Sequence, residues 1–231
     1  MDRPRLIGGL GWVAIGLALQ AVYWLTGGPA GAVTAALVTV TAIAALLMAQ
    51  RRRPQIRWWA GRIVAGLLGA DFLAAVADRF GLLGAPGAPG VSWGDWDHFL
   101  RYTDGMLPAW APAAVAAIAA TAAELALGAL LLAGAWWRWT GKLAAGLLTT
   151  YGVAMIYGYG WTSPLQYAVP VLIGAALLAS ARGGRSANRL PSRAGEPASS
   201  GRRTRAAARP TAQQNGNGRV AAAPARPSPR N

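Results

Sequence analysis

The hydrophobic positions of this sequence gather into long, nearly unbroken segments, separated by short stretches rich in glycine, proline and arginine. A helix needs about 20 predominantly apolar residues to cross a hydrocarbon layer about 30 Å thick, since it rises about 1.5 Å per residue. This criterion predicts six membrane spans and an all-α integral membrane protein. The predicted spans are residues 6–26, 30–49, 58–80, 112–136, 143–159 and 165–181.

The first two predicted spans form a transmembrane hairpin within residues 1–50. They are separated by a Gly-Gly-Pro sequence at 27–29, which breaks helices and favours a tight turn. The apolar run of residues 6–26 is longer than the 7–15 residues typical of the hydrophobic part of a signal peptide. We therefore expect this helix to be retained in the protein.

The arginines predict the orientation of the six spans. They gather near the N-terminus, between spans two and three, between spans four and five, and after span six. With six spans all these positions lie on one side of the membrane, which the positive-inside rule assigns to the cytoplasm. We expect a multi-pass protein of the cell inner membrane with both termini cytoplasmic and an outer loop at residues 81–107.

Composition narrows the function classes further. Hydrophobic residues make up 54% of the 231 positions and charged residues 13%, about half the ~25% usual in soluble domains. This composition argues against a soluble globular protein. Cysteine is absent, which rules out disulfides, thiolate nucleophiles and cysteine-bound zinc or iron–sulfur clusters.

The net charge of +14 is concentrated in residues 183–231, where arginine, alanine, serine and proline show no apolar periodicity. Such a segment lacks the apolar surface needed to offset the entropy of ordering it, so we expect a disordered cytoplasmic tail. A basic segment tethered beside a bilayer meets anionic lipid headgroups first, and we do not expect nucleic acid as its partner. The alternative is a solvated tail that only sets topology.

Two acidic residues within predicted spans require an explanation, because a charge at the centre of a span costs about 2.5–3.5 kcal/mol. Asp71 lies 14 residues after Arg57, and Glu124 lies 14 residues before Arg138, which places both about 21 Å from the cytoplasmic side. Two carboxyls at one level cannot both ionise cheaply, so we expect a shared proton.

These two carboxyls are candidate proton-handling residues. Glu124 and Asp71 would serve proton transfer or quinol binding; alternatively, each is protonated or bonded to a neighbouring helix and only fixes packing. On the first interpretation, Glu124→Gln should fold normally and lose activity. Asp78 and Arg79, two helical turns beyond Asp71, are expected at the outer interface.

The outer loop at 81–107 begins with an irregular stretch of glycine and proline. Ser92 is expected to cap a short helix in which Trp93, Trp96 and Leu100 recur at helical spacing. This aromatic stripe would lie on the outer leaflet or cover the mouth of the helix bundle.

Asp95, Asp97 and His98 in the same loop raise the question of a metal site. Their spacing spreads the three side chains around a helix, and the sequence offers no repeated ligand pattern. We therefore predict no metal and interpret these residues as a solvated helix face. His98 is the single histidine, which leaves no assignable Ser–His–acid triad.

Residues 124–145, ELALGALLLAGAWWRWTGKLAA, resemble the second-to-third helix segment of the DoxX-like membrane protein family. Residues 163–179, SPLQYAVPVLIGAALLA, resemble the final helix of that family. Weaker, gapped agreement with its first helix is found in an earlier stretch. The matching positions are Arg62, Gly66, Asp71, Glu124, Leu125, Gly128, Leu130, Gly134 and Arg138.

The resemblance implies a DoxX-like four-helix bundle over residues 57–181, to which the hairpin and the basic tail are additions. Some relatives are linked to quinone-dependent sulfur-compound oxidation or to membrane redox complexes. The resemblance therefore implies quinone as a cofactor and other membrane redox subunits as partners. The expected function is an integral membrane component of a quinone-linked oxidoreductase or redox complex, and the alternative is a non-enzymatic membrane subunit or small-solute carrier.

Overall fold

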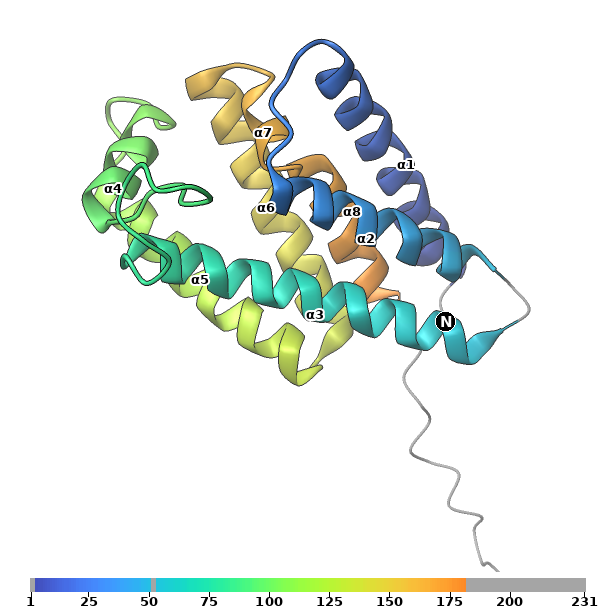
Figure 1. The fold of residues 1–231 in the computed structure, drawn as a ribbon. Coiled ribbons are helices and arrows are strands. Elements are labelled where there is room, and N and C mark those ends of the chain that lie inside the picture. The colour runs from blue at the N-terminus through green and yellow to red at the C-terminus, as the bar shows by residue number, and fades with distance from the viewer. Residues whose placement is uncertain (1–2, 51–52, 182–231) are drawn as a thin grey trace, which may run out of the picture. The chain divides into compact units, whose positions relative to one another are not determined.

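The computed structural model describes residues 3–50 and 53–181, and all regular secondary structure in these two ranges is helical. The predicted all-α class is confirmed for this part of the chain, whereas the predicted tail at 183–231 lies outside it. The helices, in chain order, are α1 (Arg3–Leu25), α2 (Ala32–Ala49), α3 (Pro54–Arg79), α4 (Trp96–Gly105), α5 (Ala113–Ala133), α6 (Trp137–Tyr159), α7 (Ser163–Gln166) and α8 (Val169–Ser180) (Figure 1).

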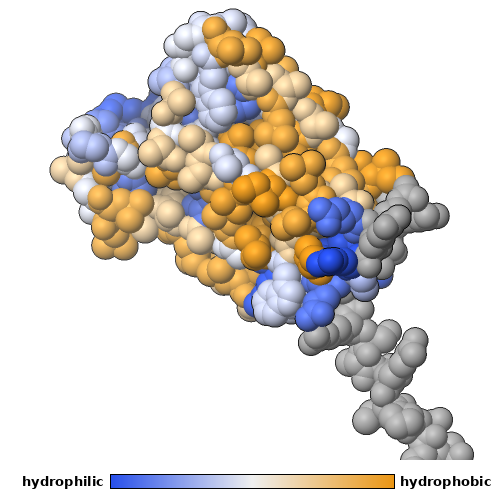
Figure 2. Space-filling model, turned by 45° about the vertical axis from the view of Figure 1, so that its right-hand side comes forward, coloured by the Kyte–Doolittle hydropathy of each residue, from blue (hydrophilic) through white to orange (hydrophobic). Residues whose placement is uncertain are grey.

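Four of these helices, α1, α2, α3 and α5, are long and apolar enough to cross a bilayer. Helix α6 has 23 residues and carries Arg138 and Lys142 in its first turns. Helix α8 is apolar but has 12 residues, which span about 18 Å. The face in Figure 2 shows a broad hydrophobic region between hydrophilic patches. Together these features indicate a helical membrane protein.

The prediction of one continuous helix over residues 165–181 is wrong. The structure divides this segment into α7 and α8, and Ala168 between them has a φ of 50°. In a continuous helix, Pro170 would clash with the carbonyl of Gln166 and could not donate a hydrogen bond to it. The Gln166 carbonyl instead accepts a hydrogen bond of 3.1 Å from the Thr34 hydroxyl of α2.

The N-terminal hairpin packs directly against the last helix of the bundle. A Cβ atom added to Gly16 of α1 would lie 2.8 Å from the Pro170 carbonyl carbon, and one added to Gly174 of α8 would lie 2.8 Å from the Val13 nitrogen. Small residues allow such a close approach of the two backbones. In lipid, the van der Waals packing that results drives helix association in place of the hydrophobic effect. Helices α1 and α8 therefore form a tight antiparallel pair.

Helices α3 and α5 form a second close pair, and their register positions the candidate site. A Cβ atom added to Gly69 would lie 2.9 Å from the Gly128 carbonyl oxygen, and the reverse distance is 3.0 Å. Asp71 lies about 3 Å along α3 from Gly69, and Glu124 lies about 6 Å along α5 from Gly128. Because the helices are antiparallel, both residues lie toward the same end of the pair. At the other end of the pair, Arg62 donates to the Leu132 carbonyl at 2.9 Å, a favourable place for a cation at a helix C-terminus.

The short helix of the outer loop begins later than predicted. Its N-cap is Asp95, whose carboxylate accepts a hydrogen bond of 2.7 Å from the His98 backbone N–H, so the predicted Ser92 cap is wrong. Both residue types cap helices well. Asp95 takes this role because Trp93 and Gly94 are held in a non-helical turn that precedes α4.

We predict that Gly16→Leu destabilises the protein, because its side chain would overlap the α8 backbone. The matched control is Gly11→Leu on the same helix, where an added Cβ meets nothing within 4 Å. Both changes raise helix propensity equally, but overpacking costs about 1–3 kcal/mol at the first position. Thermal unfolding in detergent measures the difference, and equal melting temperatures would contradict the α1–α8 packing.

Candidate functional site

The C-terminal end of α3 carries two buried charged residues. Asp78 is 4% exposed and Arg79 is 2% exposed, so neither side chain is solvated. The loop after α3 folds back, together with α4, over the end of the helix and covers both. Their predicted place at the membrane interface stays a prediction.

Arg79 forms a buried ion pair with Glu124 of α5. Its Nη2 atom lies 2.6 Å from the Glu124 Oε2 atom, and its Nη1 atom donates to the Thr121 hydroxyl at 2.8 Å. The backbone of Arg79 is about 12 Å beyond Asp71 along α3. The sequence did not predict this pair, because the helical rise per residue gives only the depth of each backbone position. An arginine side chain is long enough to reach across more than one helical turn.

Two further ionisable side chains lie beside this ion pair. Asp71 of α3 is close enough to Glu124 for the two carboxylates to interact electrostatically. The Tyr151 hydroxyl of α6 interacts with both Glu124 and Arg79. We call Asp71, Arg79, Glu124 and Tyr151 the polar centre. It joins α3, α5 and α6 around the buried Arg79–Glu124 ion pair.

Aromatic rings cover the outer side of the polar centre. The Arg79 guanidinium carbon lies 3.8 Å from the Phe99 ring centroid and 5.3 Å from that of Trp93, within the range of cation–π attraction. Trp93 stacks on Tyr167 at 6.4 Å and meets Tyr102 edge-on at 6.3 Å. We call Trp93, Phe99, Tyr102 and Tyr167 the aromatic cap. The loop aromatics were expected either on the outer leaflet or over the mouth of the bundle. The structure places Trp93 over the end of the bundle.

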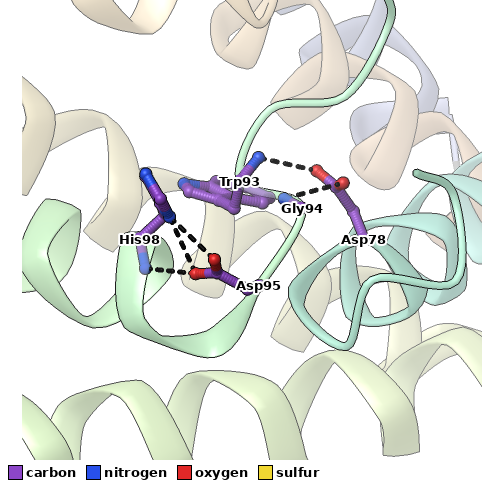
Figure 3. Close-up of polar contacts among 5 residues, drawn as sticks. All are labelled: Asp78, Trp93, Gly94, Asp95 and His98. Atoms are coloured by element: carbon purple, nitrogen blue, oxygen red, sulfur yellow. Dashed lines mark hydrogen bonds and ion pairs between the residues drawn. The ribbon is translucent and has the colours of Figure 1, made fainter. Parts of the chain in front are cut away.

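Asp78 fixes the position of Trp93 in this cap. Its carboxylate accepts backbone hydrogen bonds from Trp93 at 3.1 Å and Gly94 at 3.3 Å (Figure 3). It also accepts one from the Ser92 backbone at 2.9 Å. Gly94 has a φ of 73°, and a Cβ atom there would collide with the backbone of Pro86. Asp78 therefore anchors the loop, while its neighbour Arg79 serves the polar centre.

Several buried polar atoms around the Arg79–Glu124 pair remain without a hydrogen-bond partner within residues 3–50 and 53–181. They are Arg79 Nε, Trp93 Nε1, Tyr151 Oη and Glu124 Oε2, the last of which contacts Arg79 as an ion pair without an aligned hydrogen bond. Buried polar groups in native proteins are nearly always paired with protein, water or ligand. Two atoms of the ion pair, the Tyr151 hydroxyl beside it and the Trp93 indole N–H therefore lack an aligned hydrogen-bond partner in the described part of the chain.

His98 and Asp95 lie apart from the polar centre, on the exposed side of α4. The Nδ1 atom of His98 is 2.8 Å from the Asp95 carboxylate (Figure 3). The His98 backbone N–H, and then the His98 side chain, lower the pKa of Asp95 by hydrogen bonding to its carboxylate. In the ranges that the structure covers, no three His, Cys, Asp or Glu side chains gather into a potential metal site.

Comparisons with known proteins give no independent assignment. No family model matches the chain, no curated protein is detectably similar to it, and no solved structure matches its fold. The chemistry of the polar centre therefore carries the functional assignment.

The ion pair changes the expectation for Glu124→Gln. Sequence alone predicts that this variant folds normally, but a glutamine would leave the buried Arg79 guanidinium without its counter-charge. We predict that Arg79→Leu and Glu124→Gln each destabilise the protein by about 3–5 kcal/mol, because each leaves one buried charge unpaired.

The matched control is Arg101→Leu, at an exposed arginine of α4. The Arg79→Leu/Glu124→Leu double variant should lose less stability than the sum of its single variants, since it leaves neither charge. Denaturant unfolding in detergent measures all of these variants. Additive losses in the double variant would show that Arg79 and Glu124 do not interact.

Proposed function

We propose that this chain is an integral membrane component of a quinone-linked oxidoreductase or membrane redox complex, and that its polar centre binds the quinone head group. The unpaired donor atoms at the Arg79–Glu124 pair carry this proposal: they are Arg79 Nε, Tyr151 Oη and the Nε1 atom of Trp93, whose ring lies 5.3 Å from the guanidinium carbon. A quinone ring is flat and apolar, and its two carbonyl oxygens accept hydrogen bonds. It matches hydrogen-bond donors placed beneath aromatic rings.

The residues of the site have separate roles in this proposal. A bound quinone supplies two-electron, two-proton redox chemistry, and the electrons come from or go to a separate redox subunit. Arg79 and Tyr151 orient the head group by hydrogen bonding. The aromatic cap excludes water and offers ring faces for stacking.

Glu124 and Asp71 are the proposed proton-handling residues. The two carboxyls are close enough to interact, and Glu124 is held by Arg79. Repulsion between neighbouring carboxylates favours one bound proton per pair, which can be given up or taken back as the occupant of the site changes. In this arrangement Arg79 positions Glu124, and Asp71 provides the second proton-binding group.

The proposal includes membership of the DoxX-like family over residues 57–181, on the basis of the matching motif positions. It also includes six membrane crossings in the cell inner membrane, with α6 as the fifth and α7 with α8 as the sixth. The segregation of arginines supports cytoplasmic termini. Lipids would surround the bundle, and anionic headgroups would attract the basic tail.

The topology has a direct test. A reporter enzyme fused after Ala181 should read as cytoplasmic, because an even number of crossings returns the chain to the side of the N-terminus. A fusion within residues 82–90 of the outer loop is the internal control and should read as non-cytoplasmic. A non-cytoplasmic reading after Ala181 would contradict six crossings.

Quinone binding is tested with Tyr151→Phe and Asp71→Asn, which change the polar centre without removing either member of the ion pair. The matched control is Tyr157→Phe on the same helix, whose side chain is 67% exposed. We predict that Tyr151→Phe weakens binding about tenfold, the equivalent of one hydrogen bond of about 1.4 kcal/mol. Asp71→Asn should abolish proton exchange with solvent on quinone binding or reduction.

The measurements are equilibrium quinone binding to the full chain in lipid nanodiscs and proton exchange in weakly buffered solution. Tyr157→Phe should match the unmodified protein in both. Equal affinity of all four proteins, or no quinone binding at all, would leave the polar centre as a structural element of a non-enzymatic subunit or carrier.

A further inference from the structure

The last two turns of α1 bury polar atoms that belong to no interaction within the described part of the chain. Gln20 is 0% exposed, and neither its Nε2 nor its Oε1 atom has a hydrogen-bond partner there. The same holds for the buried Tyr23 Oη and Trp24 Nε1 atoms. We call Gln20, Tyr23 and Trp24 the α1 seam. A lone unpaired glutamine would be an isolated packing defect, but three side chains with unpaired polar atoms within five residues of α1 require a common explanation.

The antiparallel register of α1 and α8 places the seam against the break between α7 and α8. Gly9 approaches Leu178, and Gly16 approaches Pro170, so each step along α1 moves one residue back along α8. Extending this register by one helical turn would bring Gln20 level with residues 166–168, where the chain leaves helical geometry. Trp24 packs beside Val38 and Ala168, which confirms the placement on the hairpin side of the break.

The break itself is a fixed element of the fold. The Thr34 hydroxyl of α2 satisfies the Gln166 carbonyl, and the backbone N–H groups of Val171 and Leu172 bond to the Ala168 carbonyl. Its geometry is therefore held from both α2 and α8. The seam is built from α1, α2 and this break, whereas the polar centre is built from α3, α5 and α6.

The chemistry of the seam selects its ligand. Gln20 offers both a donor and an acceptor, the Tyr23 phenol offers both, and the Trp24 indole offers a donor. None of these three groups is charged. A cation would face the amide and indole N–H donors, and an anion would lack a positive partner. A hydroxyl group both donates and accepts, and it matches this mixed, uncharged set.

We propose that the α1 seam is a second binding site, which takes an uncharged hydroxyl group between α1, α2 and the α7–α8 break. The hydroxyl is supplied by a buried water molecule or by the free hydroxyls of a lipid with a glycerol head group. This site is independent of the proposed quinone site and lies in the N-terminal hairpin, outside the DoxX-like segment. Bound hydroxyl would stabilise the hairpin against the bundle by satisfying groups that are otherwise desolvated.

The test uses the full chain in lipid nanodiscs, without added quinone. Magic-angle-spinning NMR should show magnetisation transfer to the Trp24 indole N–H from water or from lipid glycerol protons. Comparing lipid with deuterated and with protonated glycerol separates the two sources. The indole signal is assigned by its loss in Trp24→Phe. Transfer from water identifies water, and transfer that depends on lipid glycerol protons identifies the lipid. Trp12, on the same helix and 39% exposed, is the control and should show no transfer from slowly exchanging water.

Gln20→Leu should reduce the transfer to Trp24 at least severalfold and lower the melting temperature, since it removes the ligand's main partner and leaves Tyr23 and Trp24 unpaired. The matched control is Gln55→Leu at an exposed position of α3, outside the seam, which should change neither. If Gln20→Leu does not fold, Tyr23→Phe removes a single hydroxyl and gives the same readout. No transfer to Trp24 from either source in the unmodified protein, or a raised melting temperature in Gln20→Leu, would overturn the proposal.

Discussion

The buried contact between Arg79 and Glu124 is the interaction on which the rest of the bundle's outer half depends. An arginine and a glutamate that are each about 2% exposed are tolerated in an apolar bundle because they neutralise each other. Glu124 holds α5 to the end of α3, and the aromatic rings of the outer loop cover the guanidinium. The positions of the loop, of α3 and of α5 thus all depend on neutralising and covering the buried Arg79 and Glu124 charges.

The sequence predicted the helices well because long apolar runs bounded by glycine, proline and arginine allow few alternatives. It also identified Glu124 and Asp71 as the acids that need an explanation. It did not identify Arg79 as the partner of Glu124, because a side chain's reach and the fold of a distant loop are not visible in helical periodicity. Asp78 was missed for the same reason: its three hydrogen-bonding partners lie 14–16 residues away in an irregular stretch.

The division of the last predicted helix into α7 and α8 shows a similar limit. Pro170 signalled a disruption, since a proline inside a helix removes one hydrogen bond and crowds the preceding turn. The sequence could not show that Thr34, more than 130 positions away, supplies the missing donor. Nor could it show the close α1–α8 contact that Gly16 and Gly174 allow, which packs the hairpin against α8.

The central claim is that the polar centre beneath the aromatic cap receives a quinone head group. Photoaffinity labelling of the full chain in nanodiscs with an azidoquinone, followed by peptide mapping, tests it most directly. The account predicts labelling in the outer-loop peptide that contains Trp93 and Phe99 and in the α6 peptide that contains Tyr151, with competition by unlabelled quinone. Labelling confined to exposed apolar positions outside the polar centre, such as Ile43 of α2 and Ile63 of α3, without competition, would contradict it.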